Sequence, residues 1–138
     1  MKTLSVSQMA AHVYAVAKQN NIDVILRTTY RGRALPNGYA HEDLPGAMNA
    51  AIHVPEIKSA VTYALALHEL GHLLGRKPST RLEKEVAAWK WARVQALVWT
   101  DPMHRKMQRC LLSYRRWANR RRSVVRECSA LDAMLAGK

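Results

Sequence analysis

Two histidines lie four residues apart in His68-Glu69-Leu70-Gly71-His72, and this spacing limits how the chain can fold more than any other feature. An α-helix turns by about 100° per residue, so His68 and His72 would share one face, one turn apart. Both imidazoles could then bind the same metal ion. Glu69 would lie about 100° away around the helix, where its carboxylate reaches a water on the ion more easily than the ion itself. The segment therefore predicts a helix with two metal ligands and a general base.

A hydrolytic zinc site needs three protein ligands and one open position, so a third ligand is expected on a separate element. Glu85 follows His72 by thirteen residues, with Gly75 to end the first helix and Thr80 to cap a second from about residue 81. This length of chain can reverse direction and return a carboxylate to the histidines. Glu83 competes for the role, but its capping-box position directs it to the helix N-terminus. We therefore predict one Zn²⁺ ion held by His68, His72 and Glu85, with Glu69 as general base for peptide-bond hydrolysis.

The rest of the chain predicts helices around a small early sheet. Apolar spacing and cap residues predict helices over residues 5–19, 55–75, 81–99, 103–122 and 124–136, with Asp101-Pro102 as a helix break. Short β-type runs predict strands at 22–27 and 50–54. Residues 28–48, rich in Gly, Pro, Asn and Asp, predict a loop or irregular hairpin. The strand at 50–54 could pair with an extended substrate or simply complete the sheet. The predicted fold class is α+β, mostly helical.

Length and composition indicate one domain over residues 1–138, with a core of its own. The N-terminal stretch lacks the unbroken apolar run of a signal peptide, and no stretch approaches the roughly 18 apolar residues of a membrane span. Two cysteines, Cys110 and Cys128, do not make a disulfide framework and are expected to be small buried hydrophobes. We expect a cytoplasmic protein without a membrane partner.

The positive charge is concentrated towards the C-terminus. The formal net charge is +12, and residues 101–138 carry ten Lys and Arg against three Asp and Glu. Such a segment can be a solvated face that keeps the protein soluble, or it can attract nucleic acid or an acidic protein. The candidate contacts with such a partner are Arg116, Arg120, Arg121 and Arg122.

The sequence HELGHLLG, followed by Glu85 and then Ala88-Trp89-Lys90-Trp91-Ala92, resembles the ImmA/IrrE family of HExxH metallopeptidases. The resemblance covers about residues 1–100. It implies a zincin-like catalytic core of the gluzincin type, with the small sheet packed on the active-site helix. It also implies that Glu85 is the third zinc ligand, that the substrate is a helix-turn-helix repressor or similar regulator, and that the chain is a phage or prophage protein. Trp89 stands where the family usually has Asn, and Trp91 where it has Phe. Residues 101–138 match nothing in the family and are expected to form a basic helical extension.

Two functions follow from these features. The first is a zinc-dependent endopeptidase that cleaves a regulatory protein. The alternative is a peptidase-like binding module whose basic surface contacts DNA or an acidic protein. In the peptidase, a further donor to the oxyanion would help catalysis, and nothing in the sequence ranks the five candidates Tyr39, His41, His53, His104 and Tyr114.

Overall fold

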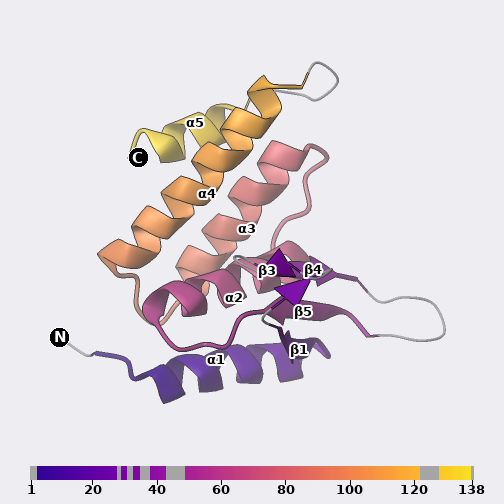
Figure 1. Cartoon of the computed structure of the whole chain (residues 1–138), viewed down its shortest axis with the longest axis vertical. Helices are drawn as coiled ribbons and strands as arrows, with labels where there is room; N and C mark the ends of the chain where they lie inside the picture. The colour runs from indigo at the N-terminus through magenta and orange to yellow at the C-terminus, as the bar shows by residue number, and fades with distance from the viewer. Residues whose placement is uncertain are drawn as a thin grey trace.

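Five helices and five short strands make up the part of the chain that the structure describes. This computed structural model describes residues 3–27, 29–30, 33–34, 38–42, 49–121 and 128–137. In chain order the elements are α1 (Val6–Gln19), β1 (Asp23–Leu26), β2 (Thr29–Tyr30), β3 (Arg33–Ala34), β4 (Tyr39–His41), β5 (Ala51–Val54), α2 (Ala60–Leu74), α3 (Arg81–Gln95), α4 (Asp101–Asn119) and α5 (Ser129–Leu135). The fold is α+β and mostly helical, as predicted, with α1 on one side of α2 and α3 to α5 on the other (Figure 1).

Cap residues set the starts of α1 and α3 where the sequence predicted them. The Ser5 hydroxyl accepts the backbone N–H of Gln8 at 3.1 Å, and Oε1 of Gln8 accepts the backbone N–H of Ser5 at 2.8 Å, so α1 begins at Val6. Thr80 accepts the backbone N–H of Glu83 at 3.2 Å, and α3 begins at Arg81. Each hydroxyl satisfies a donor that the first helical turn leaves free.

Several predicted helix boundaries are wrong, including those of 103–122 and 124–136, which are observed as Asp101–Asn119 and Ser129–Leu135. The helix expected from Pro55 begins instead at Ala60, because Ser59 and Thr62 form a capping box there. The helix expected to run to residue 99 ends at Gln95. Asp101-Pro102 does not break a helix but opens α4, since proline costs nothing in a first turn where its missing N–H has no partner to lose.

The three-stranded sheet has the order β1-β5-β4, with β5 parallel to β1 and antiparallel to β4. The strand predicted at 50–54 therefore lies in the centre, where both of its edges are paired. The interpretation of it as a substrate-binding edge is wrong, because β1 and β4 are the edge strands of this sheet among the described residues. Within the predicted loop region, β2 and β3 form a separate antiparallel pair. The rest of that prediction, over residues 28, 31–32, 35–37 and 43–48, lies outside the described residues.

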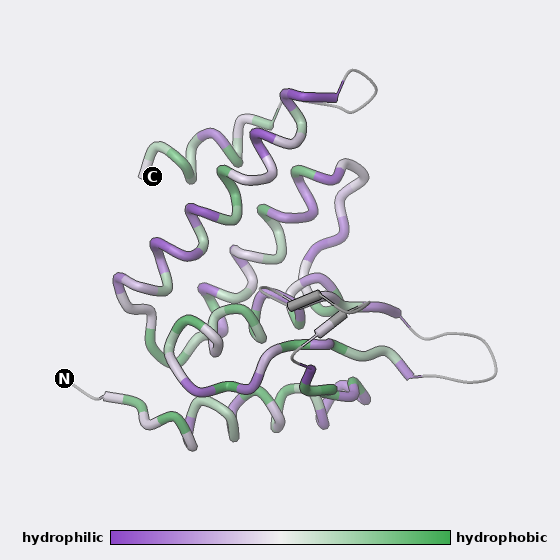
Figure 2. Tube along the Cα trace, in the orientation of Figure 1, coloured by the Kyte–Doolittle hydropathy of each residue, from purple (hydrophilic) through white to green (hydrophobic). Residues whose placement is uncertain are grey.

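Helix α2 lies at the centre of the molecule and contacts α1, α3, α4, β4 and β5. Figure 2 shows hydrophobic residues on the inner sides of these elements and hydrophilic residues recurring along α4. The C-terminal helices share the core with the rest of the chain, through the buried side chains of Met103, Met107, Leu111, Leu131 and Met134. Among the described residues, no helix is long and apolar enough to cross a membrane.

One buried tyrosine links three separate parts of the fold. The hydroxyl of Tyr63 on α2, a fully buried residue, lies 2.6 Å from Nδ1 of His12 on α1. It also accepts the backbone N–H of Leu97, just after α3, at 3.1 Å. Burial lowers the pKa of His12, so its ring is neutral at pH 7 and Nδ1 can accept the phenol proton. Both partners would lose their hydrogen bond if the hydroxyl were removed.

We therefore expect Tyr63→Phe to lower the free energy of unfolding by about 1–3 kcal/mol, because it leaves polar groups on two elements without a partner. Urea denaturation followed by circular dichroism measures this change. Tyr14→Phe is the matched control, since Tyr14 also lies in a helix but is 43% exposed. Its effect should stay within about 0.5 kcal/mol. Equal effects of the two substitutions would contradict this role for Tyr63.

Candidate metal centre

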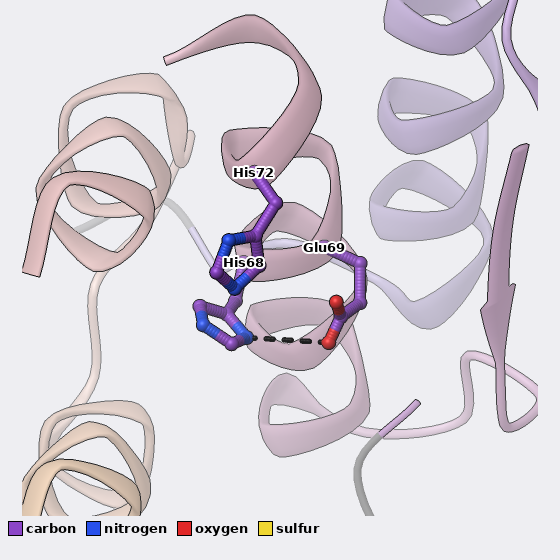
Figure 3. A group of neighbouring side chains, drawn as sticks. All are labelled: His68, Glu69 and His72. Carbon is purple, nitrogen blue, oxygen red and sulfur yellow. Dashed lines mark ion pairs between the residues drawn. The ribbon is translucent and has the colours of Figure 1, made fainter. Parts of the chain in front are cut away.

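The three residues of the histidine motif meet on α2 as its periodicity predicts. His68 and His72 lie one turn apart with their ring centroids 4.6 Å from each other, and the Glu69 carboxylate turns towards His68 (Figure 3). Nδ1 of His68 is 3.4 Å from Oε2 of Glu69, which is longer than a strong hydrogen bond. Potential ligand atoms of all three residues lie within 4.8 Å of one another. His68 and Glu69 are buried, at 6% and 4% exposure.

Glu85 on α3 reaches both imidazoles. Its Oε1 lies 3.2 Å from Nε2 of His68, and its Oε2 lies 2.8 Å from Nε2 of His72. Glu85 is 1% exposed, so its charge is kept almost completely from solvent. The competing residue is Glu83, whose backbone N–H donates to the Thr80 hydroxyl at the start of α3. The structure thus brings Glu85 to the histidine pair, while Glu83 takes part in the α3 cap through its backbone N–H only, without the return bond that a capping box would have.

Gly71 allows the two helices to come this close. A Cβ atom at this position would lie 2.4 Å from the carbonyl oxygen of Ala88 and 3.0 Å from its Cα, both in the α3 backbone. Real Cβ contacts are longer than this, so only glycine permits the observed separation of α2 and α3. Ala88 is three residues beyond Glu85, close to the same side of α3. This contact is the reason why a glycine, which weakens helices, stands within the motif.

The donor set fits a zinc ion. Two imidazole nitrogens and a carboxylate oxygen match the His₂Glu ligands of hydrolytic zinc sites. Zinc bonds of roughly 2.0–2.2 Å in a tetrahedron place neighbouring ligand atoms about 3.3–3.5 Å apart. The observed separations of 3.2 and 2.8 Å between Glu85 and the two imidazoles are slightly shorter. A small outward shift of these side chains would therefore accommodate the ion.

Without a metal, the same atoms hold a proton. Burial alone would lower the pKa of His68, but the carboxylates of Glu69 and Glu85 outweigh it and raise that pKa to about 9. Burial alone would raise the pKa of Glu85, but hydrogen bonds and charge from His68 and His72 lower it to about 2. At neutral pH the metal-free site therefore contains a protonated His68 paired with an ionised Glu85. A metal ion has to displace that proton.

A cavity of about 410 Å³ opens beside these residues. One wall is α2, a second is the chain around β4, and a third is formed by α3 and α4 together. Tyr114 was one of the five unranked donor candidates, but the rest of the α4 contribution was not predicted, because residues 101–138 were treated as an extension of the catalytic core. The signal was present, since three α4 residues that line the cavity recur at helical spacing: Cys110, Ser113 and Tyr114.

Three of the five candidate oxyanion donors line the cavity and two do not. Tyr39, His41 and Tyr114 line the cavity. His53 is buried in β5, where its ring stacks on Tyr39 with centroids 4.2 Å apart. His104 accepts a hydrogen bond from the indole of Trp99 at 3.2 Å and does not line the cavity.

The indole of Trp89 packs against the ring of His68. Its indole is fully buried and stacks on the His68 ring, with centroids 4.3 Å apart and planes at 14°. A wide flat ring against His68 restricts the rotation of the imidazole. This gives a packing role to the residue that departs most clearly from the family pattern.

The predicted basic contacts lie away from the cavity. Arg116, Arg120 and Arg121 are exposed at the end of α4, and the guanidinium carbon of Arg121 lies 5.7 Å from the Trp117 ring centroid. Arg122 lies outside the described residues. Comparisons of the chain with models of protein families, with curated proteins and with solved structures find no match.

We expect Gly71→Ala to separate α2 from α3, because the added Cβ would meet backbone atoms that no side-chain rotation can move. The free energy of unfolding should fall by about 1–3 kcal/mol. In the metal-free variant, NMR titration should also show a lower pKa for His68, since Glu85 moves away from its ring. Val94→Ala is the control, since Val94 lies on α3 but is 78% exposed. A His68 pKa that stays unchanged in Gly71→Ala would contradict the role of this contact.

Proposed function

We propose that this chain is a zinc-dependent endopeptidase that holds one zinc ion through His68, His72 and Glu85. The observation that carries the proposal is the buried Glu85 carboxylate, which lies 3.2 Å from one imidazole of the histidine motif and 2.8 Å from the other. The motif supplies two ligands and a separate helix supplies the third. This leaves the fourth position that a hydrolytic zinc site requires.

The cost of burying charge supports a functional role over a structural one. A buried ion pair usually stabilises a fold no more than apolar side chains of similar size. Here two carboxylates and two imidazoles line one cavity, and the side chain of His72 is 23% exposed. Such a group beside an accessible cavity is typical of a catalytic site.

In the proposed reaction, Glu69 moves the proton. A zinc ion bound at this site would polarise the scissile carbonyl and make water nucleophilic near neutral pH. Glu69 is placed on α2 next to the ligands, and its carboxylate takes the proton of the attacking water. The same carboxylate then passes that proton to the leaving amine. His68 and His72 act only through their ring nitrogens, and Trp89 holds one of these rings in place.

The substrate backbone is proposed to lie along β4. This strand is at the edge of the sheet, and Tyr39 to His41 line the cavity together with His68 and Glu69. Extended peptides commonly add to such edges through main-chain hydrogen bonds. Gly38 lets the chain before β4 lie close to β5 and to Glu69. A Cβ at this position would lie 2.6 Å from the His53 carbonyl oxygen and 3.5 Å from Cγ of Glu69. That the substrate is a regulatory protein, such as a helix-turn-helix repressor, stays a prediction of the family resemblance.

The alternative function as a binding module for DNA or an acidic protein has less support. It accounts for the exposed arginines of α4, but a solvated basic face accounts for them equally well. It gives no reason for a buried carboxylate between two imidazoles. We therefore retain hydrolysis as the proposed function.

We expect Glu69→Gln to keep zinc and to lose peptide cleavage by at least about 100-fold, because the amide cannot accept the water proton. Zinc content is measured by atomic absorption, and cleavage by mass spectrometry with candidate repressors and a proteome-derived peptide library. Glu83→Gln is the matched control, since Glu83 has the same side chain but belongs to the α3 cap. Wild-type rates in Glu69→Gln would rule out the proposed base.

Zinc affinity should rise with pH, by about tenfold per unit between pH 6 and 8, because each ion displaces a proton from His68. The sign follows from the pKa of about 9 for His68 in the metal-free protein, which keeps the ring protonated throughout this range. Glu85, with a pKa of about 2, is already ionised and adds no dependence. Competition with a chelator of known affinity measures the slope. An affinity independent of pH would mean that zinc does not bind His68.

A further inference from the structure

Tyr114 on α4 faces the same cavity as the proposed zinc ligands. It lies beyond residues 1–100, which carry the family resemblance, so its position is a property of this chain. Cys110 and Ser113 line the cavity from the same side of α4, one turn earlier and one residue earlier. The wall that α4 contributes to this cavity therefore carries a phenol hydroxyl.

Arg81 on α3 contacts this phenol. Its Nη2 donates to the Tyr114 oxygen at 3.4 Å, and its guanidinium carbon lies 5.5 Å from the centroid of the Tyr114 ring. Arg81 is four residues before Glu85, so both lie on one face of α3, one turn apart. Because the phenol oxygen accepts from Arg81, its own proton is left to point elsewhere. The positive charge of Arg81 also polarises the O–H bond and makes it a stronger donor.

The other polar groups on the cavity walls are less suited to donate to a reacting carbonyl. Nδ1 of His41 lies 3.0 Å from the Glu42 carbonyl oxygen, and its Nε2 is buried without a hydrogen-bond partner. Tyr39 lies on the β4 wall, where the substrate backbone is proposed to bind, with its ring flat against His53. Tyr114 combines a place on the cavity with a neighbour that directs its proton.

We infer that the Tyr114 hydroxyl donates a hydrogen bond to the carbonyl oxygen of the scissile peptide as negative charge develops there, and that Arg81 positions it. This inference rests on the proposed peptidase function. It makes Tyr114 a catalytic residue that contacts the reacting atoms, and Arg81 a positioning residue that acts through it. The phenol keeps its proton throughout, so the step adds no acid or base to the reaction of Glu69.

The ionisation of Tyr114 agrees with a donor role. Burial raises the pKa of its phenol, and the charges of Glu85 and Glu69 raise it further, while Arg81 opposes them. The hydroxyl therefore stays protonated at neutral pH. A neutral phenol that faces the same cavity as the two carboxylates can donate to a developing anion, because its proton is already in place.

The first test needs no knowledge of the natural substrate. Acetohydroxamate is a small chelator whose oxygens bind an open metal position, and its binding to Co²⁺-substituted protein changes the visible spectrum. Tyr114→Phe should weaken acetohydroxamate binding by about tenfold, the effect of one lost hydrogen bond to a charged oxygen. The affinity of Tyr114→Phe for Co²⁺ should equal that of the wild type. Tyr14→Phe, on the exposed side of α1, should bind both as the wild type does.

The second test measures turnover of peptides that the zinc-loaded wild type cleaves in a proteome-derived library. Tyr114→Phe should lower kcat by about 100-fold with KM within about threefold, as expected for a donor used only in the transition state. Arg81→Met should lower kcat about tenfold at saturating zinc in the wild type but should have no further effect in Tyr114→Phe. That lack of additivity distinguishes positioning of Tyr114 from a general loss of structure.

The possible failures are separable. If the wild type cleaves peptides and Tyr114→Phe matches it in kcat and in acetohydroxamate affinity, the inference is overturned and the proposed function stands. If Arg81→Met lowers kcat equally in both backgrounds, Arg81 does not act through Tyr114. If the metal-loaded wild type neither cleaves peptides nor binds acetohydroxamate, the peptidase proposal fails and the inference fails with it.

Discussion

The arrangement of this protein depends on the contact between α2 and α3 at Gly71, where helix backbone touches helix backbone. One missing Cβ atom lets the Ala88 carbonyl approach so closely that Glu85, on the same helix, reaches two imidazoles of α2. The ends of both helices help to fix this contact. Gly75 ends α2 by donating its N–H to Gly71, and Thr80 starts α3 after a short connection. The candidate metal centre is therefore a consequence of helix packing and not of a flexible loop.

That contact also creates an electrostatic problem, which the site resolves by pairing. Ionised carboxylates lose much of their hydration when buried, and here two of them are almost completely hidden from solvent. A protonated His68 balances Glu85 and keeps the charge of the metal-free pocket low. A divalent ion bound in the proposed site would balance the same carboxylates when the proton leaves. The apo and metal-bound forms can thus share one backbone, because one cation replaces another at nearly the same point.

The sequence was sufficient for those parts of the site that depend on local geometry. Helical spacing placed His68, Glu69 and His72, and the length of the connection together with the Thr80 cap distinguished Glu85 from Glu83. It was insufficient wherever contacts between distant segments decide the outcome. Nothing local indicates that residues 39–41 form the edge strand beside Glu69, or that Tyr114 lies on the same cavity as a residue more than forty positions earlier. The wrong start of α2 has a different, local origin. Pro55 is acceptable in a first turn, but the Ser59 and Thr62 pair caps the helix better.

The stack of Trp89 on His68 has an optical consequence. Of the four tryptophans in the chain, Trp89 is the one that lies flat against a proposed metal ligand. An excited indole readily transfers an electron to a protonated imidazole, so Trp89 should be dim while His68 carries its proton and brighter once an ion has replaced it. The protein thus contains its own fluorophore for the state of the centre. An observer could follow loading of the site by emission alone, without a dye or a substrate.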